Sequence, residues 1–263
     1  MLVIANNLSF RNKAFVKAAR SGDTSAMSAM ARELKDAGAD ILNISLSLDG
    51  DGDEKYMAAA AGAVREAGLP LSIDSRNPRA HKEAIKAAGV PLIINYVSAE
   101  PSRARDMDEV IGIAAENRTD LVLYALRGGT PHDSEERLAI ISELIERAND
   151  AGVDNSRLIV DPVILHVAGG IGQRHAVAVQ ETLYGLRELV EPPVRTTCWL
   201  SNVSAGAPKE LRFAINDTFL AMLAGLGLWS ACLDVLNRET MRTVRLIRAL
   251  KDEAVYSTAD AVL

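Results

Sequence analysis

Short apolar segments alternate with longer amphipathic segments along the whole chain. The apolar segments are rich in Val, Ile and Leu at consecutive positions, which is typical of strands buried on both faces of a parallel sheet. This pattern predicts strands at residues 2–5, 40–46, 69–74, 91–95, 120–125, 157–161, 195–201 and 229–233. It predicts a helix after each strand, at residues 24–37, 54–67, 79–88, 103–117, 133–151, 175–190, 209–224 and 238–250.

Many of the predicted helices end at a glycine, such as Gly38, Gly68 and Gly152, as expected where the capping residue needs a positive φ. Strict alternation of strand and helix implies a parallel sheet, because each helix must return the chain to the same end. Eight such units in 263 residues favour an α/β protein with a closed (β/α)8 TIM barrel over a doubly wound sheet. Since no linker or internal repeat interrupts the pattern, residues 1–263 are predicted to form a single domain.

Charge and composition narrow the class of protein. The formal net charge is −6, whereas a nucleic-acid-binding protein would show a basic stripe. The N-terminal segment lacks the features of a signal peptide, and no apolar run approaches the roughly 20 residues that span a bilayer. A cytoplasmic protein without membrane contact is therefore expected. Cys198 and Cys232 lie in apolar segments without CxxC spacing, which predicts buried thiols in a reducing compartment and no metal site.

Barrel enzymes carry their chemistry at the carboxyl ends of the strands, so the residues that end each apolar segment are the candidates for a site. Short acids and amides dominate these positions, which are Asn6, Asn7, Asn43, Ser45, Asp74, Asn95, Arg127, Asp161, Ser201, Asn202 and Asp234. The strand ends contain no histidine cluster, catalytic lysine or nucleophilic serine motif. Such a set of hydrogen-bond donors and acceptors suits a heterocycle with several ring nitrogens and an amino group.

Four of these candidates each have a functional and a structural interpretation. Asp74 could accept two hydrogen bonds from a guanidine-like ring edge, or could cap the following helix. Asn95 offers a donor and an acceptor, or could form an Asx turn. Asp161 precedes Pro162, which would hold its carboxylate toward the barrel mouth, and the alternative is a loop cap. Asn202 could hydrogen-bond a nitrogen whose charge changes during a reaction, or could be a turn residue.

Longer polar side chains near the predicted mouth of the barrel give weaker evidence for a binding site. Arg212 falls in the first turn of a predicted helix, where it could meet a carboxylate of a ligand or lie in solvent. His132, His166 and His175 fall in or beside predicted loops, without a neighbouring set of carboxylates or metal ligands. A structural role is expected for all three histidines.

Five segments carry a resemblance to a known family. They are Ser72–Asn77 (Ser-Ile-Asp-Ser-Arg-Asn), Ile94–Asn95, Val160–Leu165 (Val-Asp-Pro-Val-Ile-Leu), Leu200–Ser204 (Leu-Ser-Asn-Val-Ser) and Ile215–Met222 (Ile-Asn-Asp-Thr-Phe-Leu-Ala-Met). Their order and spacing resemble those of the pterin-binding methyltransferases. The chain looks most like a methyltetrahydrofolate:corrinoid/iron–sulfur protein methyltransferase. It is more distantly similar to the folate domain of cobalamin-dependent methionine synthase and to dihydropteroate synthase.

The resemblance implies a pterin-binding barrel, a substrate and a set of site residues. The residues that would bind the folate are Asp74, Asn95, Asp161, Ser201, Asn202 and Arg212, the last only if the intervening loop holds two extra residues. Asn202 would be the catalytic residue, because its amide would hydrogen-bond N5 of the folate as that nitrogen gains a proton. The methyl group would move between methyltetrahydrofolate and the cobalt of a corrinoid (cobalamin) carried by a partner protein. Members of the family commonly form homodimers.

Two segments depart from the family pattern. The first strand of the family ends in Gly-Glu-Arg-x-Asn, whereas this chain has Ala5–Ser9 (Ala-Asn-Asn-Leu-Ser), which includes Asn6 and Asn7. The second strand of the family ends in Asp-x-Asn, whereas this chain has Asn43–Ser45. We expect both ends to lie away from the pterin-holding residues, on the side where the methyl acceptor would approach.

The altered strand ends leave two alternatives open. A non-catalytic folate-binding or assembly subunit would bind the folate without transferring a methyl group. A dihydropteroate synthase-like enzyme would need basic residues for a diphosphate leaving group and an early Asn-x-Thr-x-Asp-Ser-Phe loop, which this chain lacks.

Overall fold

The computed structural model describes residues 1–48, 50–89 and 92–256, and for residues 103–105 it describes the backbone alone. In the described residues the sheet contains eight strands. They are β1 (Leu2–Ser9), β2 (Ile41–Ser45), β3 (Leu71–Asp74), β4 (Leu92–Ser98), β5 (Asp120–Tyr124), β6 (Leu158–Asp161), β7 (Arg195–Thr196) and β8 (Ser230–Leu233). All strand pairs are parallel, in the order β7-β6-β5-β4-β3-β2-β1-β8.

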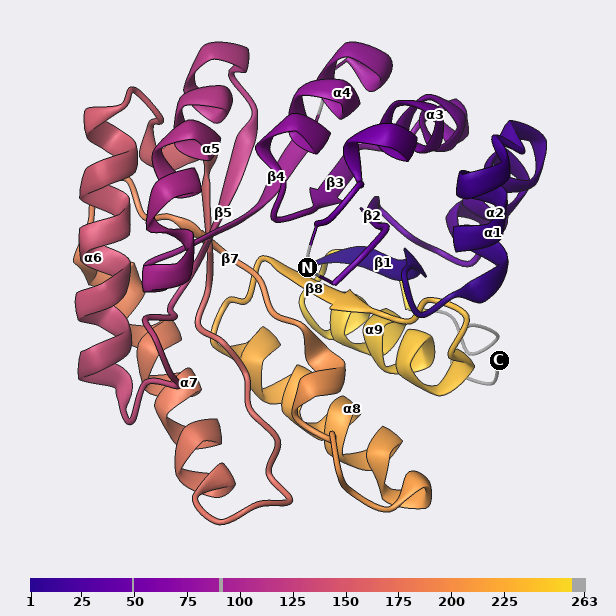
Figure 1. Cartoon of the computed structure of the whole chain (residues 1–263). Helices are drawn as coiled ribbons and strands as arrows, with labels where there is room; N and C mark the ends of the chain where they lie inside the picture. Colours follow the sequence, from indigo (N-terminus) through magenta and orange to yellow (C-terminus); the bar gives the residue numbers. More distant parts are fainter. Residues whose placement is uncertain (49, 90–91, 257–263) are drawn as a thin grey trace.

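Helices surround this sheet (Figure 1). The α-helices are α1 (Lys13–Ser21), α2 (Thr24–Asp36), α3 (Glu54–Val64), α4 (Pro78–Ala88), α5 (Ala104–Asn117), α6 (Ser134–Asp150), α7 (Gly172–Leu189), α8 (Lys209–Gly225) and α9 (Arg238–Leu250). Short 3-10 turns are η1 (Arg65–Ala67), η2 (Pro101–Arg103), η3 (Asn155–Arg157) and η4 (Leu200–Asn202). None of the helices in the described part of the chain is long and apolar enough to cross a membrane.

The sheet closes where its two ends meet. Beyond β7 the chain forms an isolated parallel bridge between Trp199 and Cys232 of β8. The Cys232 backbone N–H donates to the Cys198 carbonyl over 2.7 Å, and the Ser230 hydroxyl donates to the Thr197 hydroxyl over 2.9 Å. The predicted (β/α)8 barrel fold is therefore confirmed.

Two apolar clusters hold the barrel together. Residues on the outward faces of the strands pack against the helices, as Leu71 and Ile73 of β3 do. A smaller cluster fills the barrel and consists of Ile4, Ile41, Ile93, Val122, Ile159 and Cys232. The two sets alternate along the six strands that contribute to the inner cluster, as expected for a closed sheet covered by helices. Polar side chains follow the inner cluster toward the carboxyl ends of the strands, where Asn43 and Asn95 are buried.

Irregular pairing in two strands changes which side chains face inward. The pairing of β1 with β2 shifts between Ala5 and Leu8, and that of β4 with β5 shifts between Asn95 and Val97. An extra residue in one strand breaks the alternation of faces. As a result the consecutive residues Asn95 and Tyr96 both lie on the inner side of β4.

Several predicted boundaries differ from the structure. A second helix, α1, precedes α2 and was not predicted; the Asn12 side chain caps it by accepting from the backbone of Ala14 and Phe15. Its end at Gly22, with φ 70°, follows the usual left-handed cap. The strand predicted at residues 195–201 forms a ladder only at Arg195–Thr196; Trp199 keeps an isolated bridge to Cys232, and the chain turns into η4 from Leu200.

Smaller differences concern other element ends. Strand β1 extends to Ser9 beyond its predicted end, and α7 begins at Gly172 before its predicted start. Pro91, the predicted first residue of the fourth strand, lies outside the described residues. These differences leave the order of the elements unchanged.

Candidate functional site

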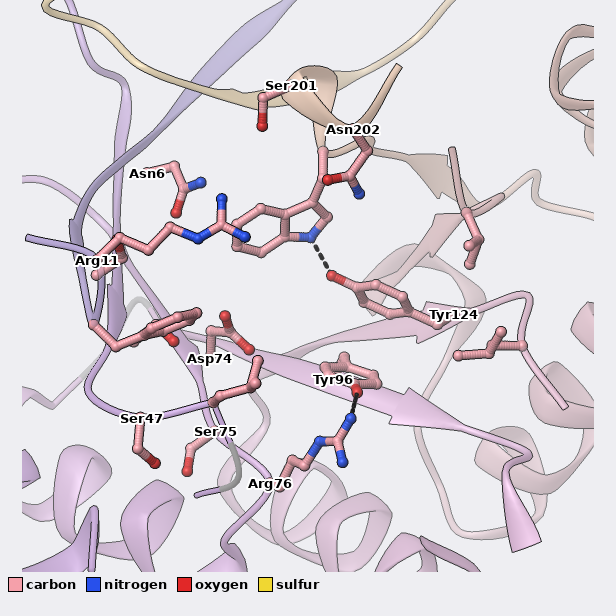
Figure 2. Close-up of a pocket in the computed structure, with 17 residues that line it drawn as sticks. Asn6, Arg11, Ser47, Asp74, Ser75, Arg76, Tyr96, Tyr124, Ser201 and Asn202 are labelled. Carbon is pink, nitrogen blue, oxygen red and sulfur yellow. Dashed lines mark hydrogen bonds between the residues drawn. The ribbon is translucent and has the colours of Figure 1, made fainter. Parts of the chain in front are cut away.

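A cavity of about 270 Å³ opens at the carboxyl ends of the strands (Figure 2). Residues at or just beyond the ends of β1 to β7 line this cavity. In a parallel barrel all these ends meet at the same face, which explains how residues as distant in sequence as Asn6 and Asn202 share one site. The cavity lies where barrel enzymes carry their chemistry.

Three predicted site residues line the cavity. Asp74 ends β3, while Ser201 and Asn202 lie in the turn η4 after β7. Because β3 and β7 are four strands apart in the sheet order, Asp74 and Asn202 face each other across the barrel mouth. The η4 turn is held by the Asn202 backbone N–H, which donates to the Trp199 carbonyl over 3.2 Å, and this leaves the Asn202 amide side chain at the cavity.

Three aromatic side chains form the deep wall of the cavity, and sequence analysis did not identify them. Tyr96 and Tyr124 pack with ring centroids 4.1 Å apart and a tilt of 41°. The Trp199 Nε1–H donates to the Tyr124 hydroxyl, and the Arg76 guanidinium donates to the Tyr96 hydroxyl over 3.3 Å (Figure 2). We call Tyr96, Tyr124 and Trp199 the aromatic floor.

Asn95 and Asp161, the two other predicted pterin ligands, are buried behind this floor. Asn95 pairs in register with Asp74, and Asp161 pairs in register with Tyr124. Their exposed fractions are 5% and 1%, and neither lines the cavity. Burial raises the pKa of Tyr124 well above its ordinary value, and the negative charges of Asp161 and Asp74 raise it further. Both carboxylates therefore lie within electrostatic reach of the same phenol.

The region behind the aromatic floor contains buried polar atoms without hydrogen-bond partners among the described residues. They are both side-chain polar atoms of Asn43, Oδ1 of Asn95 and Oδ2 of Asp161. Each unsatisfied buried group destabilises a fold by roughly 1–3 kcal/mol, so such groups usually meet water or a ligand. Donors and acceptors are both available here, which matches a ligand that has an amino group and ring nitrogens.

Asp161 is the most perturbed carboxyl group of the site. Burial raises its pKa to about 7, although Oδ1 accepts a hydrogen bond of 2.7 Å from the Val163 backbone N–H. Near neutral pH the group can therefore either accept or donate a hydrogen bond. Burial also raises the pKa of Cys198 and of Cys232 well above the ordinary value, so both thiols stay neutral. Both cysteines are free and buried, as predicted.

The strand ends that depart from the family pattern lie beside the predicted pterin-holding residues, contrary to expectation. Asn6 and Ser45 line the same cavity as Asp74 and Asn202. The expectation was wrong because β1 and β2 neighbour β3 in the sheet, so their carboxyl ends open onto the same mouth. Asn7 instead accepts from the Val235 backbone N–H over 3.2 Å and ties the end of β1 to the loop after β8.

The remaining predicted polar residues do not line the cavity. Arg212 donates through Nε to the Ala207 carbonyl over 2.9 Å, at the start of α8. His175 places Nδ1 3.3 Å from a guanidinium nitrogen of the fully buried Arg137. Burial lowers the pKa of His175, and the charge of Arg137 lowers it further. The described residues contain no group of three or more His, Cys, Asp or Glu side chains arranged to hold a metal ion.

Known proteins resemble this chain over most of its length. Two methionine synthases are each 26% identical to it, one from Mycobacterium tuberculosis (strain ATCC 25618 / H37Rv) over 201 residues and one from Mycobacterium leprae (strain TN) over 209 residues. These alignments cover 74% and 77% of this chain. The chain spans only 17% of the length of either methionine synthase.

Solved structures of similar fold include dihydropteroate synthases. The enzyme of Xanthomonas albilineans with 4-aminobenzoic acid has a TM-score of 0.70 at 20% identity, covering 97% of this chain and 94% of that one. The Yersinia pestis enzyme with a pterine-sulfa conjugate has a TM-score of 0.68 at 16% identity, covering 95% and 94%. At these identities the likeness shows the fold alone. Residues 10–232 match the family described as pterin binding enzyme, and the chain belongs to that family.

Proposed function

We propose that this protein moves a methyl group between N5 of methyltetrahydrofolate and the cobalt of a corrinoid held by a partner protein. The observation that carries the proposal is the position of the Asn202 amide, at the mouth of the barrel and across the cavity from Asp74. A pterin held at one end by a carboxylate would present its other ring to Asn202. The sequence similarity to methionine synthases supports the same chemistry.

The polar groups of the site match the hydrogen-bonding edge of a pterin. Asp74 would accept from an N–H and the adjacent amino group, as carboxylates do in bidentate pairs. Asn95 and Asp161 would complete the contact once the Tyr96 and Tyr124 rings turn aside, because these rings separate them from the cavity. The unsatisfied Oδ1 of Asn95 and Oδ2 of Asp161 would then gain partners.

The chemistry requires support of a changing charge at N5. Methyl on a tertiary amine is a poor electrophile, and departure of the folate as an anion is costly. As N5 takes a proton from solvent, its N–H would donate to the Asn202 amide oxygen, and this hydrogen bond would lower the cost. Cobalt(I) of the corrinoid, as co-substrate, supplies the nucleophile, and this chain contributes orientation and hydrogen bonds. Transfer in the opposite direction would use the same contacts.

The test measures folate binding and methyl transfer separately. Wild-type protein is titrated with methyltetrahydrofolate and then assayed for methylcobalamin formation from cob(I)alamin by absorbance. Asn202→Ala is expected to lower transfer on the order of 10²–10³-fold with a much smaller change in folate affinity. Asn117→Ala is the control, because that amide donates only to the Ile113 carbonyl on α5. Equal rates for Asn202→Ala and wild type would contradict the assignment of Asn202.

A dihydropteroate synthase reaction is the second candidate, and two residues favour it. Arg11 and Arg76 line the cavity, where guanidinium groups could meet a diphosphate leaving group. Condensation of a pterin diphosphate with 4-aminobenzoate, followed by detection of pyrophosphate, tests this reaction. Product in this assay and no methylcobalamin in the other would replace the first proposal by the second.

A non-catalytic folate-binding subunit is distinguished by the same assays. It would bind methyltetrahydrofolate and transfer no methyl group to any acceptor, including free cob(I)alamin. We also propose that the chain folds as a single domain, forms a homodimer and acts in the cytoplasm with a corrinoid protein as its partner. Light scattering of the purified chain tests the homodimer, and co-purification with a corrinoid protein tests the partner.

A further inference from the structure

Helix α1 presents a row of cations beside the mouth of the barrel. Its inner face buries Phe15, Ala18 and Ala19 against the core. Lys13, Lys17 and Arg20, at spacings of four and three residues, lie on the opposite, exposed face. Residues with these spacings share one side of a helix, so the three charges form a single line. The formal net charge of the chain is −6, so this row of positive side chains is opposite in sign to the chain as a whole.

The cations border a shallow groove that lies next to the cavity. The groove has a volume of about 540 Å³ and is lined by Phe10, Lys13, Val16, Lys17, Arg20 and Ser21. Phe10 also lines the cavity, so one side chain borders both spaces. Figure 1 shows α1 directly after β1, at the edge of the ring of helices. A molecule that leaves the cavity past Phe10 would therefore enter the groove.

The three charges have no acidic partner in the described part of the chain. None of the ion pairs formed by the described residues includes Lys13, Lys17 or Arg20. Arg20 also borders a small cavity with Asp51 and Asp53, and no ion pair forms with either of them. The cations are therefore available to an anionic ligand.

We infer that the groove binds the γ-glutamyl tail of a polyglutamylated folate, an assignment that rests on the proposed folate-binding function. Such a tail is a linear chain with one α-carboxylate per glutamyl unit and a second carboxylate on the last unit, joined by short methylene segments. Lys13 and Arg20 are seven residues apart, which corresponds to about 10 Å along the helix axis. An extended tail of about three units covers this length. Phe10 and Val16 would contact its methylene groups while the cations meet its carboxylates.

The position of the groove favours a substrate tail over an acidic surface of a partner protein. The groove shares Phe10 with the cavity that would hold the pterin, and its other lining residues come from one helix. A tail that is already anchored through its pterin can form ion pairs without a second loss of translational and rotational freedom. Each exposed ion pair changes a binding constant by a factor of roughly two to three, so the two pairs that a triglutamate adds to a monoglutamate give about fivefold.

The experiment compares folates with one and three glutamyl units. At low salt, the triglutamate of methyltetrahydrofolate is expected to bind about fivefold more tightly than the monoglutamate, measured by titration calorimetry. In about 0.5 M salt the difference should shrink toward unity, because exposed charges are then screened. The triple variant Lys13→Gln, Lys17→Gln, Arg20→Gln should bind both forms with equal affinity while its monoglutamate affinity stays within about twofold of wild type.

A second triple variant controls for the change of net charge. Arg32→Gln, Lys82→Gln and Lys86→Gln remove three exposed cations from α2 and α4, and it should keep the triglutamate preference of wild type. Equal affinity of wild type for both folates, or a preference that survives in the α1 triple variant, would overturn the tail assignment alone. Absence of any monoglutamate binding would overturn the folate proposal itself, and the tail assignment with it.

Discussion

Tyr124 and Asp161 are register partners on β5 and β6, and the phenol lines the cavity while the carboxyl group is buried behind it. The Tyr124 hydroxyl accepts from Trp199, so the ring is tied to the segment that follows β7, two strands away in the sheet. A pterin that reaches Asp161 must displace this ring. The aromatic floor therefore connects ligand binding to a measurable side-chain movement.

Tyr124→Phe is expected to speed folate association, because it removes the hydrogen bond to Trp199 while keeping the ring. Loss of one neutral hydrogen bond lowers the free energy of unfolding by about 1 kcal/mol. Stopped-flow fluorescence in a Trp229→Phe background, which leaves Trp199 as the reporter, measures the association rate. Tyr184→Phe, on the exposed face of α7, is the control and should leave the rate unchanged. An unaltered rate in Tyr124→Phe would show that the aromatic floor does not limit access.

Asp161→Asn is expected to change how stability depends on pH. Burial raises the pKa of Asp161 to about 7 in the folded protein, from 3.8 in an ordinary environment. Between these values the folded chain binds more protons than the unfolded chain, so Asp161 lowers stability as pH rises from about 4 to 7. The full effect above pH 7 is on the order of 4–5 kcal/mol, because each pKa unit of this shift corresponds to about 1.4 kcal/mol.

The difference between variant and wild type isolates this effect from other titrating groups. In urea unfolding without ligand, Asp161→Asn should match wild type near pH 4 and exceed its free energy of unfolding near pH 8. A difference that does not change between these two pH values would show that Asp161 is already ionised at low pH in the folded chain.

Asp74→Asn is expected to weaken methyltetrahydrofolate binding by about 10- to 100-fold. The amide keeps the shape of the side chain but loses the charge and one of the two acceptors that a pterin edge would use. Hydrogen bonds to charged groups contribute roughly 1.5–3 kcal/mol, which corresponds to this range. Calorimetry measures the affinity, and Asp36→Asn at the exposed end of α2 is the control. Unchanged affinity would remove Asp74 from the proposed site.

The sequence predicted the order of the elements because strand and helix periodicity are local properties of the chain. It did not predict α1, although Asn12 and Gly22 have the residue types that begin and end helices. Because one helix was expected after each strand, these two residues were not assigned to an additional helix. The seventh strand was predicted too long because the apolar residues that follow Thr196 bury their side chains after the ladder ends.

The residues that line the cavity were predicted in part, for a similar reason. Asp74 and Asn202 were selected because they are polar residues at strand ends, and both line the cavity. Tyr96 was missed because simple alternation after Asn95 points the next side chain outward. The irregular pairing between Asn95 and Val97 turns it inward, and such irregularities depend on contacts with the neighbouring strand rather than on local sequence.

Arg137→Leu is expected to destabilise the protein by about 3 kcal/mol. The Arg137 side chain is fully buried and donates to the carbonyls of Pro131, Asp133 and Pro162, which joins the loop after β5 to the loop after β6. Removal of the guanidinium leaves buried carbonyl groups without partners, and each of them costs roughly 1–3 kcal/mol unless it reaches water.

Arg147→Leu, on the same helix α6, provides the matched control. Arg147 is exposed and pairs with Asp108 at 2.7 Å, and pairs of this kind contribute about 0–1 kcal/mol. Urea unfolding of both variants at pH 7 should therefore separate them by at least about 2 kcal/mol. Similar losses in the two variants would mean that the loops stay fixed without Arg137. In that case the position of Val163 at the cavity, beyond Pro162, would depend on the Asp161 carboxylate that accepts from its backbone.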